Sequence, residues 1–426
     1  MRASTAWRFD ELRLLLLAII VALLGLTLVA LGKHEEIAFP SVFPASALAA
    51  LLIAGHLWLG WRCGAADQVL FPLAGILTTL GLILVFRLEP DTLPRQMIWI
   101  ALGIALMLAT VSFPRLLDWL KRYKYTWMLA GIGLVALTLV FGIDPNESGA
   151  RLWLGFGDIV FQPSEILKVL LVVFLAGYVD DKREIISHGS YRWGPFRLPS
   201  LPHLGPMLAM WGLSIVLLVG QKDLGATFLL FAVFLAILYV ASSRLVYVTG
   251  GLAMFLLAAV GAYYVSDHVA TRGEVWLYAW ADPEAKGYQI IQALLAFASG
   301  GVFGTGLAKG YPKTIPAIHT DFPLAAIGEE LGLLGTLAVL AIFLLLVHRG
   351  FKIAVGARNT FQQVLAAGAT ASVGIQALII IAGNLKLIPL TGITLPFVSY
   401  GGSSLVTNFI VIGLLLRISN ESAGGQ

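Results

Sequence analysis

The sequence predicts an all-α, polytopic integral membrane protein of about twelve transmembrane helices. Its composition is the first reason: of 426 residues, 58% are hydrophobic and only 12% are charged. The mean hydropathy of +0.87 lies far outside the range of soluble globular domains. The second reason is that the apolar residues gather in runs close to the roughly 20 residues that a helix needs to cross a bilayer.

The predicted spans follow one another along almost the whole chain. Those that start near Glu165, Pro206 and Ala226 are short or interrupted. The predicted spans begin near Leu14, Phe43, Val69, Met97, Tyr125, Glu165, Pro206, Ala226, Val246, Pro323, Phe361 and Ser403. An even number of spans places both termini on the same side of the membrane.

The basic residues predict that both termini are cytoplasmic, because Lys and Arg near helix ends stay on that side. Of 28 Lys and Arg residues, about 17 then fall in inner loops and about 10 in outer loops. The net charge of +4 follows from this topology and gives no reason to expect nucleic acid binding. The first apolar run is long and is followed by no small-residue cleavage pattern, so we expect a retained span.

Two regions are expected along the chain. Residues 1–66 form a predicted N-terminal two-span extension, and residues 67–420 form the main transmembrane domain. In the extension, His56 is the main polar residue, and we expect it to bond a neighbouring backbone group. Cys63 is the only cysteine, which excludes an intramolecular disulfide and a cysteine-based metal site.

Two outer loops, residues 142–163 and 266–322, are long and rich in polar residues and glycine. The second contains GYQIIQALLAFASGGVFGTGLAKG, whose apolar residues have helical spacing, so we expect an amphipathic helix at the membrane interface. The glycines that follow do not form a nucleotide-binding fingerprint, because no strand precedes them and their spacing differs.

Four polar motifs open even-numbered helices, which begin at the outer face. They are FQPSE at 161–165, QKDLG at 221–225, HTDFP at 319–323 and SYGGSS at 399–404. A helix N-terminus offers unpaired N–H groups and about half a positive charge. Clustered N-termini would therefore favour an anionic ligand, such as a phosphate, on the outer side.

Each of these motifs has a structural alternative. FQPSE is typical of a helix start, but Glu165 and Lys168 lie three residues apart and are expected to pair inside the membrane, beside a wet cavity. Asp223 is either a helix cap or part of a site, and Ser403 and Ser404 are either N-capping residues or ligand contacts.

Asp321 is the strongest candidate for chemistry, since it precedes Pro323 at the mouth of a helix, with His319 two residues earlier. Its alternative is an N-cap. Glu329 and Glu330 lie about two turns deeper, near 10 Å at 1.5 Å per residue. They need a partner at that depth, either Lys168 or backbone amides, and we expect them to support the structure.

The first long outer loop places a cation and an indole two residues apart, in GARLWL. Arg151 could clamp a phosphate with two hydrogen bonds. Trp153 is either a second ligand contact or an interfacial anchor.

Taken together, these motifs resemble the SEDS family, the membrane glycosyltransferases of shape, elongation, division and sporulation that include RodA and FtsW. GARLWLGFGDIVFQPSEILK, QKDLGATFLL, GYQIIQALLAFASGGVFGTGLAKG, HTDF with GEELG, and LPFVSYGGSS occur in the family's order between Gly149 and Arg417. IPLTG is more similar to the RodA branch. Two departures are QKDLG for the usual QPDLG, with Lys222, and DFPLA for DFIFA, with Pro323.

The resemblance implies a ten-helix family bundle plus two added spans. It also implies polymerisation of lipid II, an undecaprenyl-pyrophosphate-linked substrate, at the outer face of the bacterial cytoplasmic membrane, for cell elongation and shape or for division. A class B penicillin-binding protein would be the partner. The family's essential aspartate corresponds to Asp321. Its loop arginine and tryptophan correspond to Arg151 and Trp153, and the acid and lysine of its FQPSE helix to Glu165 and Lys168.

Glycosyl transfer needs a base for the acceptor hydroxyl and a way to stabilise the departing diphosphate. We expect Asp321 to be the catalytic base, while Arg151, the helix N-termini and either Lys386 or a divalent cation hold the charge. No cofactor or metal-ligand motif is identified. The expected substrate-binding residues are Arg151, Trp153, Glu165, Lys168, Asp223, His319, Lys386, Ser399 and Ser403.

The alternatives are a lipid II flippase or other transporter, and a scaffold for the transpeptidase. A flippase should present polar groups through the whole depth of the bilayer. Here the inner halves of most predicted spans are apolar, which favours an enzyme whose site lies at the outer surface.

Overall fold

The structure is a computed structural model that describes residues 8–32, 39–144, 150–156, 159–188, 191–193, 196–198 and 201–423. The chain forms two compact units. Unit 1 comprises Met1–Ser112, Val269–Arg349 and Gln376–Gln426, and unit 2 comprises Phe113–His268 and Gly350–Ile375.

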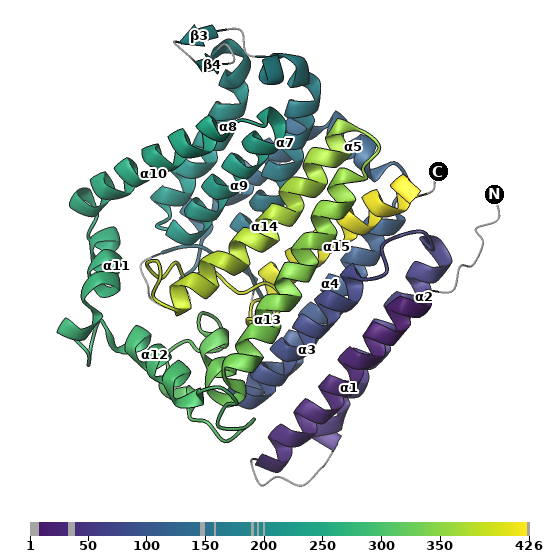
Figure 1. Ribbon diagram of the computed structural model, residues 1–426, viewed down its shortest axis with the longest axis vertical. Helices are drawn as coiled ribbons and strands as arrows, with labels where there is room; N and C mark the ends of the chain where they lie inside the picture. The colour runs from purple at the N-terminus through teal and green to yellow at the C-terminus, as the bar shows by residue number, and fades with distance from the viewer. Residues whose placement is uncertain are drawn as a thin grey trace. The chain divides into compact units, whose positions relative to one another are not determined.

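Unit 1 is built mainly from long helices (Figure 1). They are α1 (Phe9–Gly32), α2 (Phe39–Arg62), α3 (Leu70–Leu88), α4 (Leu93–Ser112), α11 (Asp267–Tyr278), α12 (Tyr288–Gly300), most of α13 (Pro323–Val355), the end of α14 (Thr360–Asn384) and α15 (Gly402–Ala423). Short 3-10 turns cover Pro90–Thr92, Ala279–Ala281 and Pro312–Thr314.

Unit 2 contains the remaining helices and two small hairpins. The helices are α5 (Leu116–Arg122), α6 (Lys124–Phe141), α7 (Pro163–His188), α8 (Leu201–Gly220), α9 (Leu224–Ser242), α10 (Leu245–Val265) and the start of α14. β1 (Leu154–Phe156) pairs antiparallel with β2 (Ile159–Phe161), and β3 (Tyr191–Trp193) with β4 (Phe196–Leu198).

The prediction of an all-α, multi-pass membrane protein is confirmed. Within the described ranges, ten helices are long and apolar enough to cross a membrane, against the roughly twelve expected from apolar runs. The two others, α7 and α8, are helices at the expected places. The end of α7 carries Asp180, Asp181 and Lys182, so charge sets α7 apart from the ten. α8 has 20 residues, close to the length that crosses a bilayer.

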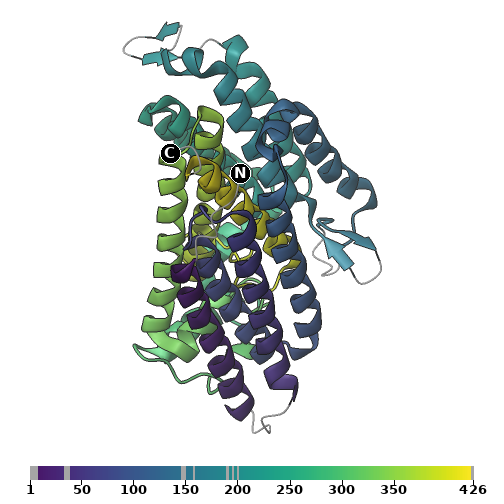
Figure 2. The same ribbon diagram turned by 90° about the vertical axis from the view of Figure 1, so that its right-hand side faces the viewer.

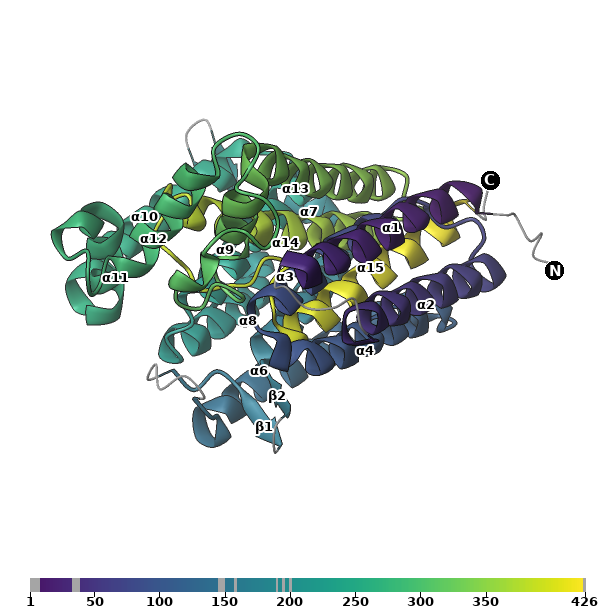
Figure 3. The same cartoon turned by 90° about the horizontal axis from the view of Figure 1, so that it is seen from below.

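In unit 1, α1 packs on α2 and α3, and α4 packs along α15 (Figure 2). Figure 3 shows α15 among the helices α1 to α4. Small residues permit the close approach of α4 and α15. A Cβ on Gly413 would lie 2.9 Å from the carbonyl oxygen of Met107, and a Cβ on Gly103 would lie 2.6 Å from the ring of Phe409.

A buried ionic cluster fastens α1 to the segment that follows α2. Arg8 donates hydrogen bonds to the carbonyls of Cys63 (3.1 Å) and Asp67 (2.9 Å) and pairs with Glu11. His56 Nδ1 lies 2.7 Å from Glu11 Oε1. The expectation of a backbone partner for His56 is therefore wrong: its Nδ1 contacts a carboxylate from the neighbouring helix. A charged partner was not visible in sequence because Glu11 lies 45 residues away.

Candidate functional site

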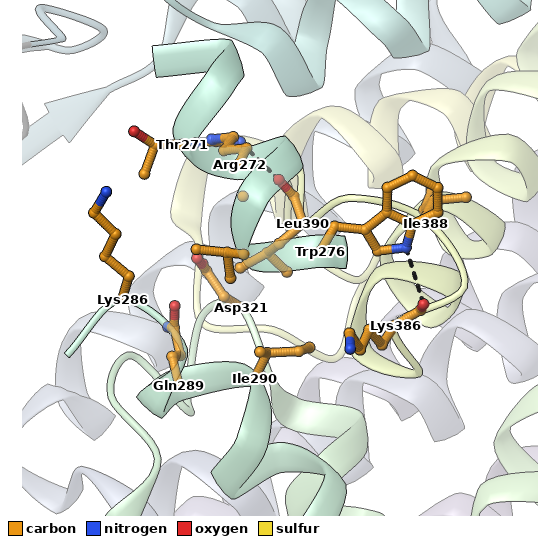
Figure 4. Close-up of a pocket in the computed structure, with 12 residues that line it drawn as sticks. Thr271, Arg272, Trp276, Lys286, Gln289, Ile290, Asp321, Lys386, Ile388 and Leu390 are labelled. Carbon is orange, nitrogen blue, oxygen red and sulfur yellow. Dashed lines mark hydrogen bonds between the residues drawn. The ribbon is translucent and has the colours of Figure 1, made fainter. Parts of the chain in front are cut away.

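A cavity of about 230 Å³ lies in unit 1 in front of the start of α13 (Figure 4). Its walls come from α11, the start of α12, the segment before α13 and the loop between α14 and α15. The polar residues that line it are Thr271, Arg272, Trp276, Lys286, Gln289, Asp321 and Lys386. Two predicted site residues, Asp321 and Lys386, therefore face the same cavity.

The backbone of Asp321 is held on both sides. Its N–H donates to the carbonyl of Ala317 (2.9 Å), and its own carbonyl accepts from Asn384 Nδ2 at the end of α14 (2.8 Å). Helix α13 begins two residues later, at Pro323, whose fixed φ suits a first helical position. The carboxylate is thereby directed to the cavity by a fixed main chain.

Burial raises the pKa of the Asp321 carboxyl above its ordinary value, while Thr320, Arg272 and His319 act in the opposite direction. Burial also lowers the pKa of His319. A carboxylate with a raised pKa is a better proton acceptor than an ordinary aspartate, because Brønsted behaviour favours bases whose pKa lies near the working pH.

The starts of α13 and α15 are joined by hydrogen bonds. Ser399 Oγ donates to the carbonyl of Thr320 (2.6 Å) and accepts from the N–H of Leu395 (2.8 Å). The N–H of Tyr400 donates to the carbonyl of His319 (2.8 Å), and the two rings lie 5.7 Å apart. Ser399 and His319 thus anchor the main chain that precedes Asp321. The predicted Ser403 is buried in the first turn of α15.

Sequence reasoning missed the cavity wall formed by α11. Arg272 Nη1 donates to the carbonyl of Leu390 (2.9 Å), and Trp276 Nε1 donates to the carbonyl of Lys386 (3.0 Å). Residues four apart share a helix face, so the spacing of Arg272 and Trp276 in a polar outer loop was the available signal. Because nothing in the sequence indicated a helix in this part of the outer loop, the spacing of Arg272 and Trp276 could not identify them as neighbours on one helix face.

Gly392 lies between two of the charged groups of the cavity, those of Arg272 and Asp321. Its φ is +71°, and a Cβ there would lie 3.7 Å from Arg272 Nη2 and 3.9 Å from Asp321 Oδ2. A longer side chain would fill the space that separates the guanidinium from the carboxylate.

Glu329 and Glu330 contact the loop between α12 and α13. Glu329 Oε1 accepts from the N–H of Tyr311 (2.7 Å), and Glu330 Oε2 accepts from the N–H of Ala308 (3.0 Å). Arg87 on α3 also pairs with Glu330, at 3.1 Å. Backbone amides, one of the two partners considered, are therefore present, and Arg87 was not anticipated.

The glycine-rich loop after α12 bridges a break in α13. At Gly332, φ is +68° and ψ is −165°, which interrupts the helix. Thr305 and Gly306 donate their N–H groups to the carbonyls of Glu329 (2.9 Å) and Glu330 (3.0 Å). On the far side of the break, the N–H groups of Leu333 and Leu334 donate to the carbonyls of Gly301 (2.9 Å) and Val302 (3.2 Å). The loop thus supplies the hydrogen bonds that the broken helix lacks.

The other predicted site residues belong to unit 2. Lys168 Nζ lies 2.8 Å from Glu165 Oε2, so the predicted ion pair is present, with Lys168 fully buried. Asp223 caps α9 by accepting from the N–H of Ala226 (2.9 Å), and it also accepts from Ser164 (3.3 Å) and the Gln162 side chain (3.2 Å). Asp223 therefore joins the starts of α7 and α9.

In the first outer loop, Arg151 is exposed, and Trp153 is partly buried and bridged to Ile143 before the β1–β2 hairpin. Across the described residues, no three His, Cys, Asp or Glu side chains are grouped in a way that could hold a metal ion.

The fold and the cavity define a class of protein: a multi-pass helical membrane protein with a carboxylate in a cavity that arginine and lysine residues also line. The chain belongs to the FtsW/RodA/SpoVE family of cell cycle proteins, whose model matches residues 68–424.

Curated relatives cover most of the chain. The peptidoglycan glycosyltransferase RodA of Mycobacterium tuberculosis (strain ATCC 25618 / H37Rv) is 36% identical, over 97% of this chain and 90% of that protein. The probable peptidoglycan glycosyltransferase FtsW of Geobacter metallireducens is 32% identical, over 84% of this chain and 96% of that protein.

Solved structures share the fold. A chain from a peptidoglycan synthase complex that coordinates polymerization and crosslinking is 25% identical, with a TM-score of 0.70 over 84% of this chain and 98% of that chain. The rod shape determining protein RodA of Thermus thermophilus is 25% identical, with a TM-score of 0.60 over 84% of this chain and 97% of that chain.

Proposed function

We propose that this chain polymerises lipid II into glycan strands, with Asp321 as the general base. Its enzyme class, peptidoglycan glycosyltransferase, follows from its family and from 36% identity to curated enzymes over nearly the whole chain. The observation that carries the choice of base is the Asp321 carboxylate, which faces a cavity also lined by Arg272 and Lys386.

The reaction needs one proton acceptor. The Asp321 carboxylate takes the proton of the acceptor sugar hydroxyl while that oxygen attacks the anomeric carbon of the donor. The bond from the anomeric carbon to the diphosphate oxygen breaks, and its electron pair leaves with the lipid diphosphate. Attack opposite the leaving group inverts the anomeric carbon, and Asp321 later releases its proton to water. No general acid is required, because a diphosphate leaves as a stable anion.

The cavity fits the reacting groups and not a whole lipid-linked substrate. Its volume of about 230 Å³ is below the roughly 300–1,000 Å³ of pockets that enclose drug-sized ligands. The sugars and peptide would extend out of the cavity, and the lipid chain would lie along the helices in the bilayer.

The proposed setting is the bacterial cytoplasmic membrane, with both termini in the cytoplasm and the site at the outer face. The basic inner loops support this orientation. A class B penicillin-binding protein is the proposed partner. The similarity to a chain of a peptidoglycan synthase complex supports an assembly of this kind. The proposed cellular role is in elongation and shape or in division.

The test is polymerisation of purified lipid II by the reconstituted full-length protein, with glycan strands resolved on a gel. Asp321→Asn should abolish polymerisation while leaving the unfolding temperature close to that of the unchanged protein. Asp91→Asn, which removes an exposed carboxylate of the same unit, should stay active. Full activity of Asp321→Asn would refute the proposed base. Assays with and without a chelator test a divalent cation as the alternative carrier of diphosphate charge.

A further inference from the structure

Helix α11 and the loop between α14 and α15 form one wall of the cavity, where hydrogen bonds fix the Arg272 guanidinium and the main chain of Lys386. The Arg272 guanidinium is anchored on the Leu390 carbonyl (2.9 Å). One turn further along α11, Trp276 anchors the backbone of Lys386 (3.0 Å). Figure 4 shows both bonds from one face of the helix to the same loop.

The loop begins with a left-handed residue just after the end of α14: Lys386 has φ +58°. Further along, Gly392 has φ +71°, which glycine adopts freely. Hydrogen bonds at the helix end hold Lys386 there: its N–H donates to the carbonyl of Gly383 (3.1 Å), and the N–H of Leu387 donates to the carbonyl of Ala382 (2.8 Å). Lys386 thus lines the same cavity as Arg272, on the far side of Trp276 (Figure 4).

Lys286 also lines the cavity but is engaged at its rim. Its Nζ lies 3.5 Å from Glu274 Oε2, and both side chains are about half exposed to solvent. The Lys286 charge is therefore offset by a carboxylate and screened by water. Arg272 and Lys386 are the cations that face Asp321 from the anchored wall.

We propose that Arg272 and Lys386 form the diphosphate subsite of the donor, across the cavity from Asp321. This assignment rests on the proposed function. When the anomeric C–O bond breaks, negative charge builds up on the departing diphosphate oxygen, and fixed cations at that position stabilise the transition state more than the ground state. The planar guanidinium of Arg272 matches phosphate oxygens with two parallel hydrogen bonds, and Lys386 supplies a point charge.

The position of Gly392 agrees with this arrangement. A Cβ there would contact both the Arg272 guanidinium and the Asp321 carboxylate, so only a residue without a side chain leaves that space open. The attacking sugar would lie at Asp321 and the leaving diphosphate at Arg272, with the anomeric carbon between them.

The kinetic test uses the reconstituted full-length protein and purified lipid II. Arg272→Gln keeps an amide donor for the Leu390 carbonyl and removes the charge. It should lower kcat about 100-fold, as loss of one oxyanion-stabilising donor does. Arg272→Lys should recover part of that loss. Lys286→Ala is the matched control, because it removes a cation from the same cavity, and it should change kcat by less than about threefold.

A binding test separates ligand contact from a structural role. Inorganic pyrophosphate should inhibit the unchanged protein, and the inhibition constant should rise at least about tenfold in Arg272→Gln and Lys386→Ala. Guanidinium ions in the buffer should partly restore Arg272→Ala but not Asp321→Asn. Equal inhibition by pyrophosphate in all variants, or equal loss of kcat in Lys286→Ala and Arg272→Gln, would overturn the assignment.

The outcomes also separate this inference from the proposed function. If Asp321→Asn is inactive while Arg272→Gln retains full kcat, the diphosphate subsite is wrong and the glycosyltransferase assignment stands. If the unchanged protein forms no glycan strands from lipid II, the proposed function itself fails.

Discussion

Gly304 gives the most direct test of how the broken helix α13 is held. Its φ is +82°, and a Cβ there would lie 2.5 Å from the carbonyl carbon of Glu330 and 2.7 Å from the nitrogen of Gly332. Both neighbours are backbone atoms of the break, so neither can rotate away. Gly304→Ala must therefore push the loop off α13.

The expected loss can be worked from two contributions. A non-glycine residue at positive φ costs roughly 1–2 kcal/mol, and overpacking against atoms that cannot move adds about 1–3 kcal/mol. Gly304→Ala should thus lose about 2–5 kcal/mol of unfolding free energy. Gly301 is the matched control: it also has positive φ, +53°, but nothing lies within 4 Å of a Cβ there. Gly301→Ala should lose only the backbone contribution of about 1–3 kcal/mol.

The assay is thermal unfolding of both variants in detergent, followed by lipid II polymerisation at a temperature where both remain folded. Gly304→Ala should unfold at the lower temperature. It should also lose activity while folded, since the half-helix that begins beside Asp321 would no longer be bridged to the rest of α13. Equal unfolding temperatures for Gly301→Ala and Gly304→Ala would refute the close contact between the loop and the break.

Three further predictions concern charge and backbone conformation. Because burial raises the pKa of Asp321, kcat should rise as the pH rises through that pKa. The free energy of unfolding should fall over the same pH range, since the folded chain holds the Asp321 proton to higher pH than the unfolded chain does. In pH-dependent unfolding, Asp321→Asn should abolish this fall in stability with pH. Glu165→Gln takes the pairing carboxylate from the buried Lys168 and should cost up to about 3–5 kcal/mol of unfolding free energy. The double replacement Glu165→Gln with Lys168→Met should cost much less in a double-mutant cycle. Lys222 has φ +63°, and its N–H donates to the Val219 carbonyl (3.0 Å). In thermal unfolding, Lys222→Gly should be stabilised by about 1 kcal/mol, because glycine adopts this φ without strain. Lys222→Pro should be destabilised by about 3 kcal/mol or more, because proline cannot adopt this φ and has no N–H to donate.

The helix starts could be read from the sequence because local chemistry determines them. Helices α7 and α13 begin at Pro163 and Pro323, and α9 begins directly after Asp223. Proline at the first position and a capping aspartate act within a single turn. The Glu165–Lys168 pair was predictable for the same reason, since residues three apart on a helix meet whatever the rest of the fold does.

Partners from distant segments could not be read in this way. Arg87 reaches Glu330 across 243 residues, and Arg272 reaches Leu390 across 118. No local pattern encodes such contacts, because they depend on how helices pack. The break at Gly332 was hidden for a related reason: a lone glycine within an apolar run is tolerated in a helix, and only the bridging loop reveals its conformation.

The departure QKDLG shows how a local substitution changes the backbone that a resemblance would suggest. Proline fixes φ near −65° and has no N–H, whereas Lys222 lies at φ +63° and donates its N–H to Val219. The turn before α9 in this chain is therefore one that the family's usual proline cannot adopt. Asp223 still caps α9 and still joins it to the start of α7. The capping carboxylate, and not the residue before it, thus determines where this helix begins.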